Sequence, residues 1–274
     1  MGDERGRVEA VAAAMASAFG SAPEAFITLG SGLGPVVDRA TVLKRVPTTE
    51  LGLPASTVVG HAGQAVLAEL SGTRVLFLSG RVHRYEGYSM HEVVRYVRAA
   101  WKWGAKRLIL SCSAGSLVPE LDPGTVTLLS DHLNLMGDNP LIGGPLFESE
   151  ATFPDSAQAH DPLICADLLR AAKTADVALP RGIYAALSGP AYESEAECNM
   201  LRIMGANLVG MSTVPELLAA KALDLPSAAF AVVSNYGAGV GEGSVDHASV
   251  TAVAGRAAST LSAVLERAAG AWGS

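Results

Sequence analysis

The sequence has few cysteines and no excess of positive charge. Its three cysteines, Cys112, Cys165 and Cys198, lie far apart and form no C-x-x-C pair. This excludes a disulfide framework and a zinc knuckle, and it indicates a reducing compartment. The formal net charge is −7 at pH 7. Because proteins that bind nucleic acid usually carry a basic surface, we expect no nucleic-acid partner.

Long apolar segments and metal-ligand motifs are also missing. No run approaches the roughly 20 uninterrupted apolar residues of a membrane-spanning helix. The start, MGDERGRVEAVAAAM, lacks the apolar stretch of a secretory signal. The histidines have no H-E-x-x-H or similar spacing. We therefore expect a cytoplasmic protein without a membrane partner and without a metal site.

Apolar residues are abundant, and strand and helix patterns alternate along the chain. Apolar residues make up 49% and charged residues 17% of the 274 residues, as in a well-buried globular protein. Strands are expected over 25–29, 74–79, 107–112, 125–130, 184–187, 208–211 and 228–234, and helices over 5–19, 91–103, 161–175, 193–204, 215–223 and 246–269. The strands are apolar without alternation, which predicts a central sheet covered by helices. No linker or repeat divides the chain, so we expect a single domain over residues 1–274.

Between the strands, the longest irregular segment is the stretch Gly137–Pro154, which is rich in proline and glycine. Such a segment suits an active-site loop or a contact between subunits. In α/β folds, the groups that do chemistry sit at the carboxyl ends of strands and in the loops beyond them. Several expected strands here end in a small polar cluster, which predicts one site assembled from many strand ends.

The first cluster, Gly30-Ser31-Gly32-Leu33-Gly34, is a glycine loop after a short apolar strand. Such a loop lets backbone N–H groups approach an anion closely. It lacks the dinucleotide fingerprint, because Pro35 stands where the last glycine belongs, and no Gly-Lys-Ser/Thr follows as in a Walker A motif. A plain tight turn explains this loop equally well when it is taken alone.

The second cluster spans residues 80–88, where Arg81 and His83 follow a buried strand two residues apart. In an extended chain these two side chains face the same side and can hold one oxyanion together. Tyr85 adds a hydroxyl, and Glu86 adds a carboxylate that would orient His83. A solvated charged turn is the alternative, but it suits Arg84 better than the whole set.

Two further clusters offer anion-binding groups. Small residues in SCSAGSL at 111–117 would expose main-chain amides to a ligand, or they would simply pack closely. In VGMSTVPE at 209–216, Ser212 ends an expected strand and would bind phosphate. Thr213 and Glu216 have the spacing of a capping box, so we expect Thr213 to cap the helix that follows.

Two clusters carry groups suited to a flat heterocycle. Tyr192 would stack on a ring, and Glu193 would accept a hydrogen bond from a ring N–H. The alternative for Glu193 is an acid at the start of a helix, favoured by the helix dipole. Asn235 ends a buried strand with an amide that donates and accepts at once. Its alternative is an asparagine that forms a turn.

Together these clusters resemble the trimeric class of purine nucleoside phosphorylases. The matching segments are GSGLG at 30–34, VGHAG at 59–63, GRVHRYEGY at 80–88, SAGSL at 113–117, DHLN at 131–134, GPAYE at 189–193, VGMSTVPE at 209–216, SN at 234–235 and VDH at 245–247. Each piece is weak alone, but their order and spacing are highly specific. The resemblance implies an α/β fold: a single domain with a mixed, partly barrel-like central β-sheet flanked by helices.

The resemblance also implies a role for each matching residue. Phosphate would be bound by Ser31, Arg81, His83, Ser113 and Ser212, the sugar by His61, Tyr85, Phe153, Met211 and His247, and the base by Ala114, Tyr192, Glu193, Val209, Gly210 and Asn235. The catalytic residues would be Asn235, Glu193 and His83. Phe153 would reach the sugar site of a neighbouring subunit in a homotrimer. The partners would be a purine nucleoside and inorganic phosphate, a co-substrate, with no cofactor and no metal.

The activity implied is reversible phosphorolysis of 6-oxopurine (deoxy)ribonucleosides, inosine and guanosine, to the free base and (deoxy)ribose 1-phosphate. Hypoxanthine and guanine carry an N1–H that Glu193 would accept, whereas adenine N1 is itself an acceptor. Related methylthioadenosine phosphorylases have an acidic residue where this chain has Asn235, and His247 favours a polar 5′-hydroxyl. A xanthosine-accepting variant and methylthioadenosine phosphorylase remain as alternatives within the family.

Two alternatives belong to other classes of protein. A nucleotide-dependent oxidoreductase is suggested by the glycine loop and disfavoured because the dinucleotide fingerprint is incomplete. A non-catalytic nucleoside- or phosphate-binding protein would need the pocket without turnover, and the retained set of Arg81, His83, Glu193 and Asn235 argues against it.

Five positions in three segments depart from the family pattern. Ser111-Cys112-Ser113 stands where the family usually has Thr-Asn-Ala, Tyr236 replaces the more usual Lys, Leu or Met, and Tyr192 replaces the Phe of many members. These changes bear on the phosphate loop and on the preference among bases, and they leave the implied reaction class intact.

Overall fold

A computed structural model describes residues 3–58, 61–241 and 247–273, except for the side chains of 247–249. Its strands are β1 (Ala25–Leu29), β2 (Thr41–Pro47), β3 (Gln64–Leu70), β4 (Thr73–Ser79), β5 (Leu108–Ser116), β6 (Val126–Asn134), β7 (Arg181–Ala186), β8 (Leu208–Gly210) and β9 (Ser227–Tyr236). Its α-helices are α1 (Glu4–Phe19), α2 (Met90–Val93), α3 (Arg95–Trp103), α4 (Pro162–Thr174), α5 (Glu195–Ile203), α6 (Val214–Ala222) and α7 (His247–Trp272). Short 3₁₀ helices are η1 (Gly34–Arg39), η2 (Thr48–Leu51), η3 (Arg84–Glu86) and η4 (Ser156–Gln158).

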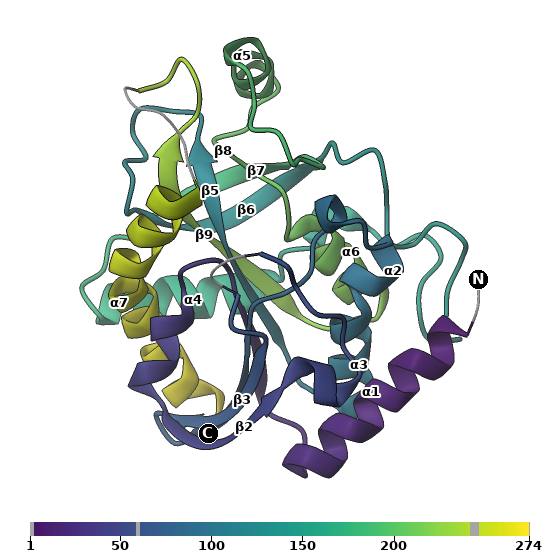
Figure 1. The fold of residues 1–274 in the computed structure, drawn as a ribbon. Helices are drawn as coiled ribbons and strands as arrows, with labels where there is room; N and C mark the ends of the chain where they lie inside the picture. The colour runs from purple at the N-terminus through teal and green to yellow at the C-terminus, as the bar shows by residue number, and fades with distance from the viewer. Residues whose placement is uncertain (1–2, 59–60, 242–246, 274) are drawn as a thin grey trace.

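The strands form one mixed sheet that closes on itself at one end. Their order is β2-β3-β4-β1-β5-β8-β7-β6-β9, and β9 also pairs with β5. This extra pairing makes a barrel of β5, β8, β7, β6 and β9, while β2, β3, β4 and β1 extend from it. Helices lie on both sides, with α4 and α7 on one side and α1, α3 and α6 on the other (Figure 1). The expected mixed, partly barrel-like sheet flanked by helices is confirmed.

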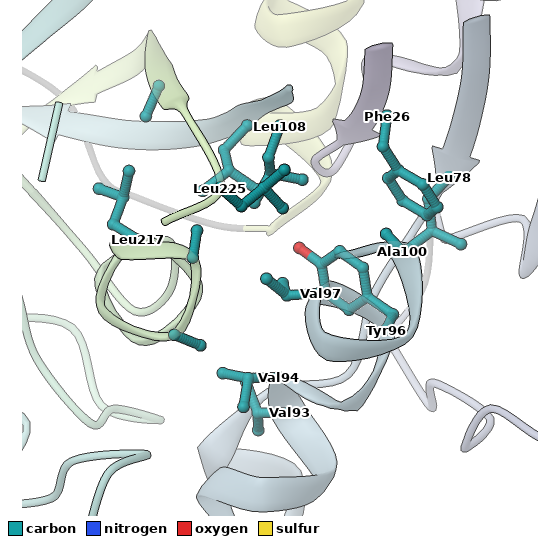
Figure 2. Close-up of a cluster of buried hydrophobic side chains, with 14 of the residues drawn as sticks. Phe26, Leu78, Val93, Val94, Tyr96, Val97, Ala100, Leu108, Leu217 and Leu225 are labelled. Carbon is teal, nitrogen blue, oxygen red and sulfur yellow. The ribbon is translucent and has the colours of Figure 1, made fainter. Parts of the chain in front are cut away.

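Two apolar layers hold the helices to the sheet. One packs α1, α3 and α6 against β1, β4 and β5, and the other packs α4 and α7 against the opposite faces of these strands and of β9. All five residues of β1 are buried, as expected for a strand covered on both faces. Figure 2 shows part of the first layer, where the Tyr96 ring of α3 lies beside Phe26 of β1 with ring centroids 5.8 Å apart.

The parallel pairing at the centre of the sheet places several strand ends together. β1 is parallel to both β4 and β5, and β5 is parallel to β9. Their carboxyl ends therefore meet at one edge, as the pattern of polar clusters predicted. The loops after β1 and β4 and the ends of β5 and β9 all carry predicted site residues.

The start of α4 agrees with the prediction, because the residues that begin it are a capping aspartate and a proline. Asp161 caps α4 by accepting hydrogen bonds from the backbone N–H groups of Leu163 and Ile164, both at 2.9 Å, and Pro162 occupies the first turn.

The helix expected over 91–103 is instead two helices, α2 and α3, because the backbone at Val94 leaves the helical region with φ −98° and ψ 5°. No helix in the described ranges is long and apolar enough to cross a membrane.

Two strands were not predicted. β2 pairs antiparallel with β3, and β3 pairs antiparallel with β4. β2 lies at the edge of the sheet, and its first five residues are exposed. β2 buries so little that it has no apolar run and no clear alternation, so hydrophobic periodicity does not indicate it. β3 is mostly buried, but its apolar run is short and has no turn residue directly before it.

Candidate active site

One cavity at this edge of the sheet gathers most of the predicted site residues. Those that line it are Ser31, Arg81, His83, Tyr85, Ser113, Ala114, Tyr192, Glu193, Val209, Gly210, Met211, Ser212 and Asn235. They come from the loops after β1, β4, β7 and β8 and from the strands β5, β8 and β9. Residues predicted for phosphate, sugar and base thus share one space, although they are spread along the whole chain.

Among the described residues, two predicted for the sugar site, His61 and Phe153, do not line this cavity. His61 lies just behind it, in contact with Ser31 and Arg81. Phe153 lies outside it on an irregular segment, and its side chain is 94% exposed. The side chain of His247 lies outside the described residues.

The glycine loop after β1 lies directly against β5. A Cβ atom at Gly30 would stand 2.8 Å from the Cα of Cys112, so only glycine allows this approach. The Ser111 hydroxyl donates to the backbone oxygen of Thr28 at 2.8 Å, and the Ser113 hydroxyl donates to that of Ser31 at 3.0 Å. The two serines that depart from the family pattern therefore hold the loop to the strand.

Arg81 lies buried at the floor of the cavity. Its Nη2 donates to the Ser212 hydroxyl at 2.9 Å, the Thr213 hydroxyl at 3.2 Å and the backbone oxygen of Ser111 at 3.1 Å. Its Nη1 lies 3.0 Å from Oε1 of Glu216. Burial alone would lower the pKa of Arg81, but the Glu216 carboxylate beside it raises the pKa, so Arg81 stays charged.

The prediction of a capping box at the start of α6 is wrong. Thr213 makes no capping hydrogen bond, and its backbone has φ 71°, which is strained for a β-branched residue. The reason is competition, because Arg81 binds both members of the expected box, the Thr213 hydroxyl and the Glu216 carboxylate. The strain is located where Ser212 is presented to the cavity.

A hydrogen-bond network around Glu86 orients His83. Glu86 Oε1 accepts from the backbone N–H of His83 at 2.8 Å and lies 2.9 Å from its Nδ1, so the expected contact between them is present. Glu86 Oε2 accepts from the Thr57 backbone N–H at 2.6 Å. Burial alone would raise the pKa of Glu86, but the hydrogen bonds from His83 and Thr57 lower it to about 2. Burial lowers the pKa of His83, so the ring is neutral near pH 7 and leaves Nε2 for a ligand.

His61 connects the glycine loop to the Arg81 segment. Its Nε2 lies 3.0 Å from the Ser31 hydroxyl, and its Nδ1 lies 2.7 Å from the backbone oxygen of Arg81. A Cβ at Gly80, where φ is +98°, would stand 2.6 Å from the His61 Cβ, so glycine is needed for this contact. Burial and the nearby His83 lower the pKa of His61 to about 4, so it too is neutral at pH 7.

Glu193 lines the same cavity as Arg81 and brings a carboxylate to it, where Arg81 brings a cation. It does not begin a helix, because Ser194 caps α5 through a complete capping box with Glu197, so the alternative reading of Glu193 is wrong. Its Oε1 is buried without a hydrogen-bond partner among the described residues. Burial raises its pKa. A buried acceptor without a donor is costly, which indicates that a ligand donor belongs there.

The Asn235 amide is held in a defined orientation. Its Oδ1 lies 2.7 Å from the Ser234 hydroxyl, which donates to it, and its Nδ2 donates to the backbone oxygen of Tyr236 at 2.9 Å. One lone pair on Oδ1 and one hydrogen on Nδ2 remain for a ligand. Ser234, which also lines the cavity, was not predicted, although it directly precedes Asn235 in the matching segment at 234–235.

Tyr236 lies outside the cavity. Its hydroxyl donates to Asp122, and a Cβ at Gly241 would collide with its ring, so the ring covers that glycine. This departure from the family pattern therefore supports the loop after β9.

Among the described residues, no group of three or more His, Cys, Asp or Glu side chains is placed to hold a metal ion.

Comparison with known proteins shows the family to which the chain belongs. Residues 25–269 match the family described as the phosphorylase superfamily. Purine nucleoside phosphorylase 1 of Bacillus subtilis (strain 168) is 37% identical over 248 residues, which cover 90% of this chain and 92% of the relative. The chain belongs to the purine nucleoside phosphorylase family. It is therefore an enzyme of the pentosyltransferase class, as expected.

Other purine nucleoside phosphorylases match this chain over similar lengths. The Mycobacterium tuberculosis (strain ATCC 25618 / H37Rv) protein is 40% identical over 244 residues, covering 87% of this chain and 86% of the relative. The crystal structure of the Schistosoma mansoni enzyme in complex with adenosine superposes with a TM-score of 0.87, at 31% identity and 96% coverage of both chains. These matches extend over the strands and loops that form the cavity.

Proposed function

We propose that the enzyme catalyses the reversible phosphorolysis of 6-oxopurine (deoxy)ribonucleosides, inosine and guanosine, to the free base and (deoxy)ribose 1-phosphate. One observation carries this proposal: a single cavity joins the hydroxyl and imidazole groups around Arg81 to the oriented Asn235 amide and to the Glu193 carboxylate, whose Oε1 has no hydrogen-bond partner among the described residues. The first set suits an anion, and the second suits a flat ring with N–H and C=O groups.

In this proposal, phosphate occupies the end formed by Ser31, Arg81, His83 and Ser212, close to the main chain of Ser113. Tyr85 and Met211 line the same cavity and would contact the sugar, together with His61, which contacts Ser31 and Arg81, and with His247 at the 5′-hydroxyl. Breaking the C–N bond builds positive charge on the sugar and negative charge on the purine. The bound phosphate stabilises the cationic sugar through its own charge and then attacks the anomeric carbon.

The base end would stabilise the leaving purine. As the base departs, its N7 takes up the proton that hydrogen phosphate loses on becoming the sugar phosphate. Asn235 Oδ1 accepts the resulting N7–H, and Nδ2 donates to O6. Glu193 accepts N1–H, which hypoxanthine and guanine have and adenine lacks. Tyr192 would stack on the ring, while Ala114, Val209 and Gly210 form the walls. Groups placed to meet charge that develops in the transition state lower the barrier without reorganising.

Phe153 supports a homotrimer in which each subunit completes its neighbour's sugar site. Its side chain is 94% exposed, which is unusual for a large aromatic residue. The segment that carries it is anchored, because Arg98 Nη2 donates to Glu150 Oε1 at 2.6 Å and to the backbone oxygen of Pro140 at 3.1 Å. An exposed aromatic residue next to an anchored part of the chain is suited to contact a second copy of the chain.

The test of the proposed function compares inosine, adenosine and methylthioadenosine, each with and without phosphate. We expect release of hypoxanthine and an equal amount of ribose 1-phosphate from inosine only when phosphate is present. We expect kcat/KM for adenosine to be lower by about 10⁴-fold, because Glu193 would face an acceptor instead of a donor. Base release without phosphate, or a preference for either adenine nucleoside, would contradict the proposal.

A further inference from the structure

Behind the anion end of the cavity lies a buried ion pair between Arg81 and Glu216. The two side chains are 2% and 0% exposed, and Arg81 Nη1 lies 3.0 Å from Glu216 Oε1. On the side facing the core, the Tyr96 hydroxyl donates to the same oxygen at 3.4 Å, and the Thr28 hydroxyl donates to that of Tyr96 at 3.1 Å. Figure 2 shows the Tyr96 ring held between α3 and Phe26. Glu216 is thus fixed against Arg81 from within the apolar core.

This carboxylate carries a cost that packing alone does not explain. Glu216 Oε2 is buried without a hydrogen-bond partner among the described residues. Removing a charge from water costs several kcal/mol, and replacing a buried ion pair by apolar side chains is often neutral or stabilising. A half-satisfied carboxylate at this place therefore indicates a role connected with Arg81 and with the anion that Arg81 would meet.

Among the residues that the structure describes, the charged side chains paired with Arg81 and His83 bring the sum of charges at the anion end below zero. Arg81 contributes one positive charge, whereas Glu216 and Glu86 each contribute one negative charge. Burial lowers the pKa of His83, and it lowers that of His61 to about 4, so both rings are neutral at pH 7. Among the described residues, Arg81 Nε and Nη1 are buried without a hydrogen-bond partner, and the other donors that line the anion end are neutral hydroxyl, imidazole and main-chain N–H groups.

We propose that Glu216 is a positioning residue that sets the affinity of the site for phosphate by cancelling most of the charge of Arg81. This inference rests on the proposed function and deepens it. Binding that is equally strong in the ground state and the transition state does not raise kcat. A cation without a counter-charge would hold phosphate and the sugar phosphate product tightly, and it would reduce the negative charge that phosphate offers to the cationic sugar.

The decisive variant is Glu216→Gln, which removes the charge and keeps nearly the same shape beside Arg81. We expect the Kd and KM for inorganic phosphate to fall on the order of tenfold, from Coulomb attraction at an effective dielectric constant near 20. We expect kcat for inosine to fall severalfold at the same time. A residue that only holds the fold together would give weaker phosphate binding, so the opposite directions of affinity and kcat separate the two roles.

Stability provides the second readout. Without phosphate, the melting temperature of Glu216→Gln should fall, because Arg81 is left as a buried charge without a counter-charge. Added phosphate should raise it more than it raises that of the wild type, since a ligand stabilises in proportion to the logarithm of its concentration over Kd. The matched control is Glu4→Gln, which breaks a buried pair with Arg95, 2.6 Å apart, far from the cavity lining. It should lower stability and leave the phosphate Kd unchanged.

If Glu216→Gln does not fold, Glu216→Asp gives the same test. Its side chain is one methylene group shorter, so the negative charge is retained but lies farther from Arg81. We expect phosphate to bind about twofold more tightly, with a smaller loss of stability. A folded variant of either kind with an unchanged or higher phosphate Kd would overturn the role of Glu216. A wild-type protein that phosphate does not stabilise at all would instead overturn the proposed phosphate site.

Discussion

Replacing Asn235 with alanine is expected to lower kcat for inosine phosphorolysis about 10²–10³-fold, the usual effect of removing a group that meets developing charge. The amide is held by the Ser234 hydroxyl at 2.7 Å and by the backbone oxygen of Tyr236 at 2.9 Å. Its free lone pair and N–H would therefore be oriented before the purine begins to leave. Steady-state kinetics with saturating phosphate measures this change.

The control for Asn235 is Asn199→Ala. Asn199 lies on the exposed face of α5, where it accepts a hydrogen bond from Arg202 at 2.9 Å, and it is outside the cavity lining. Its kcat should equal that of the wild type. Both variants should unfold within about 1 kcal/mol of the wild type, since neither opens an apolar cavity. Unchanged turnover of inosine by Asn235→Ala would remove this residue from the mechanism.

Replacing Glu193 with alanine is expected to lower the selectivity for inosine over adenosine by at least about 10-fold. A hydrogen bond to a charged group contributes about 1.5–3 kcal/mol, so kcat/KM for inosine should fall about 10- to 150-fold. The value for adenosine should change little or rise, because adenine N1 no longer meets a carboxylate. The ratio of the two kcat/KM values measures the effect.

The pH dependence of hypoxanthine binding provides a further readout for Glu193. Burial raises the pKa of Glu193, so its carboxylate takes up a proton at a higher pH than an exposed one. Hypoxanthine affinity of the wild type should therefore weaken as the pH falls through that pKa, and Glu193→Ala should lack this dependence. Glu195→Ala, which removes an exposed carboxylate outside the cavity lining, should retain it. Equal loss of inosine and adenosine activity in Glu193→Ala would contradict the proposed contact with N1–H.

The sequence was most informative where local chemistry decides structure. β1 and the cap of α4 followed from an apolar run and from Asp161-Pro162, signals that need no distant partner. The position of the site followed from polar groups after parallel strands, since the sheet brings these ends to one edge. For that reason Ser31, Arg81, Ser212 and Asn235 share one cavity.

The features that the sequence did not reveal depend on contacts between distant segments. The Thr213–Glu216 spacing indicates a capping box, but Arg81, far away in the chain, binds both side chains instead. A local sequence pattern does not show that a residue distant in the chain binds the same side chains. Ser234 was overlooked because a serine before an asparagine has many uses, and its contact with Asn235 Oδ1 is visible only in three dimensions.

The most direct test of the central claim is a crystal structure of the protein soaked with hypoxanthine and sulfate. The sulfate stands in for phosphate, and the base marks the position of the purine. We predict that both ligands occupy one cavity, with sulfate on Ser31, Arg81 and Ser212 and hypoxanthine between Glu193 and Asn235. Electron density for the two ligands in separate cavities would contradict the account.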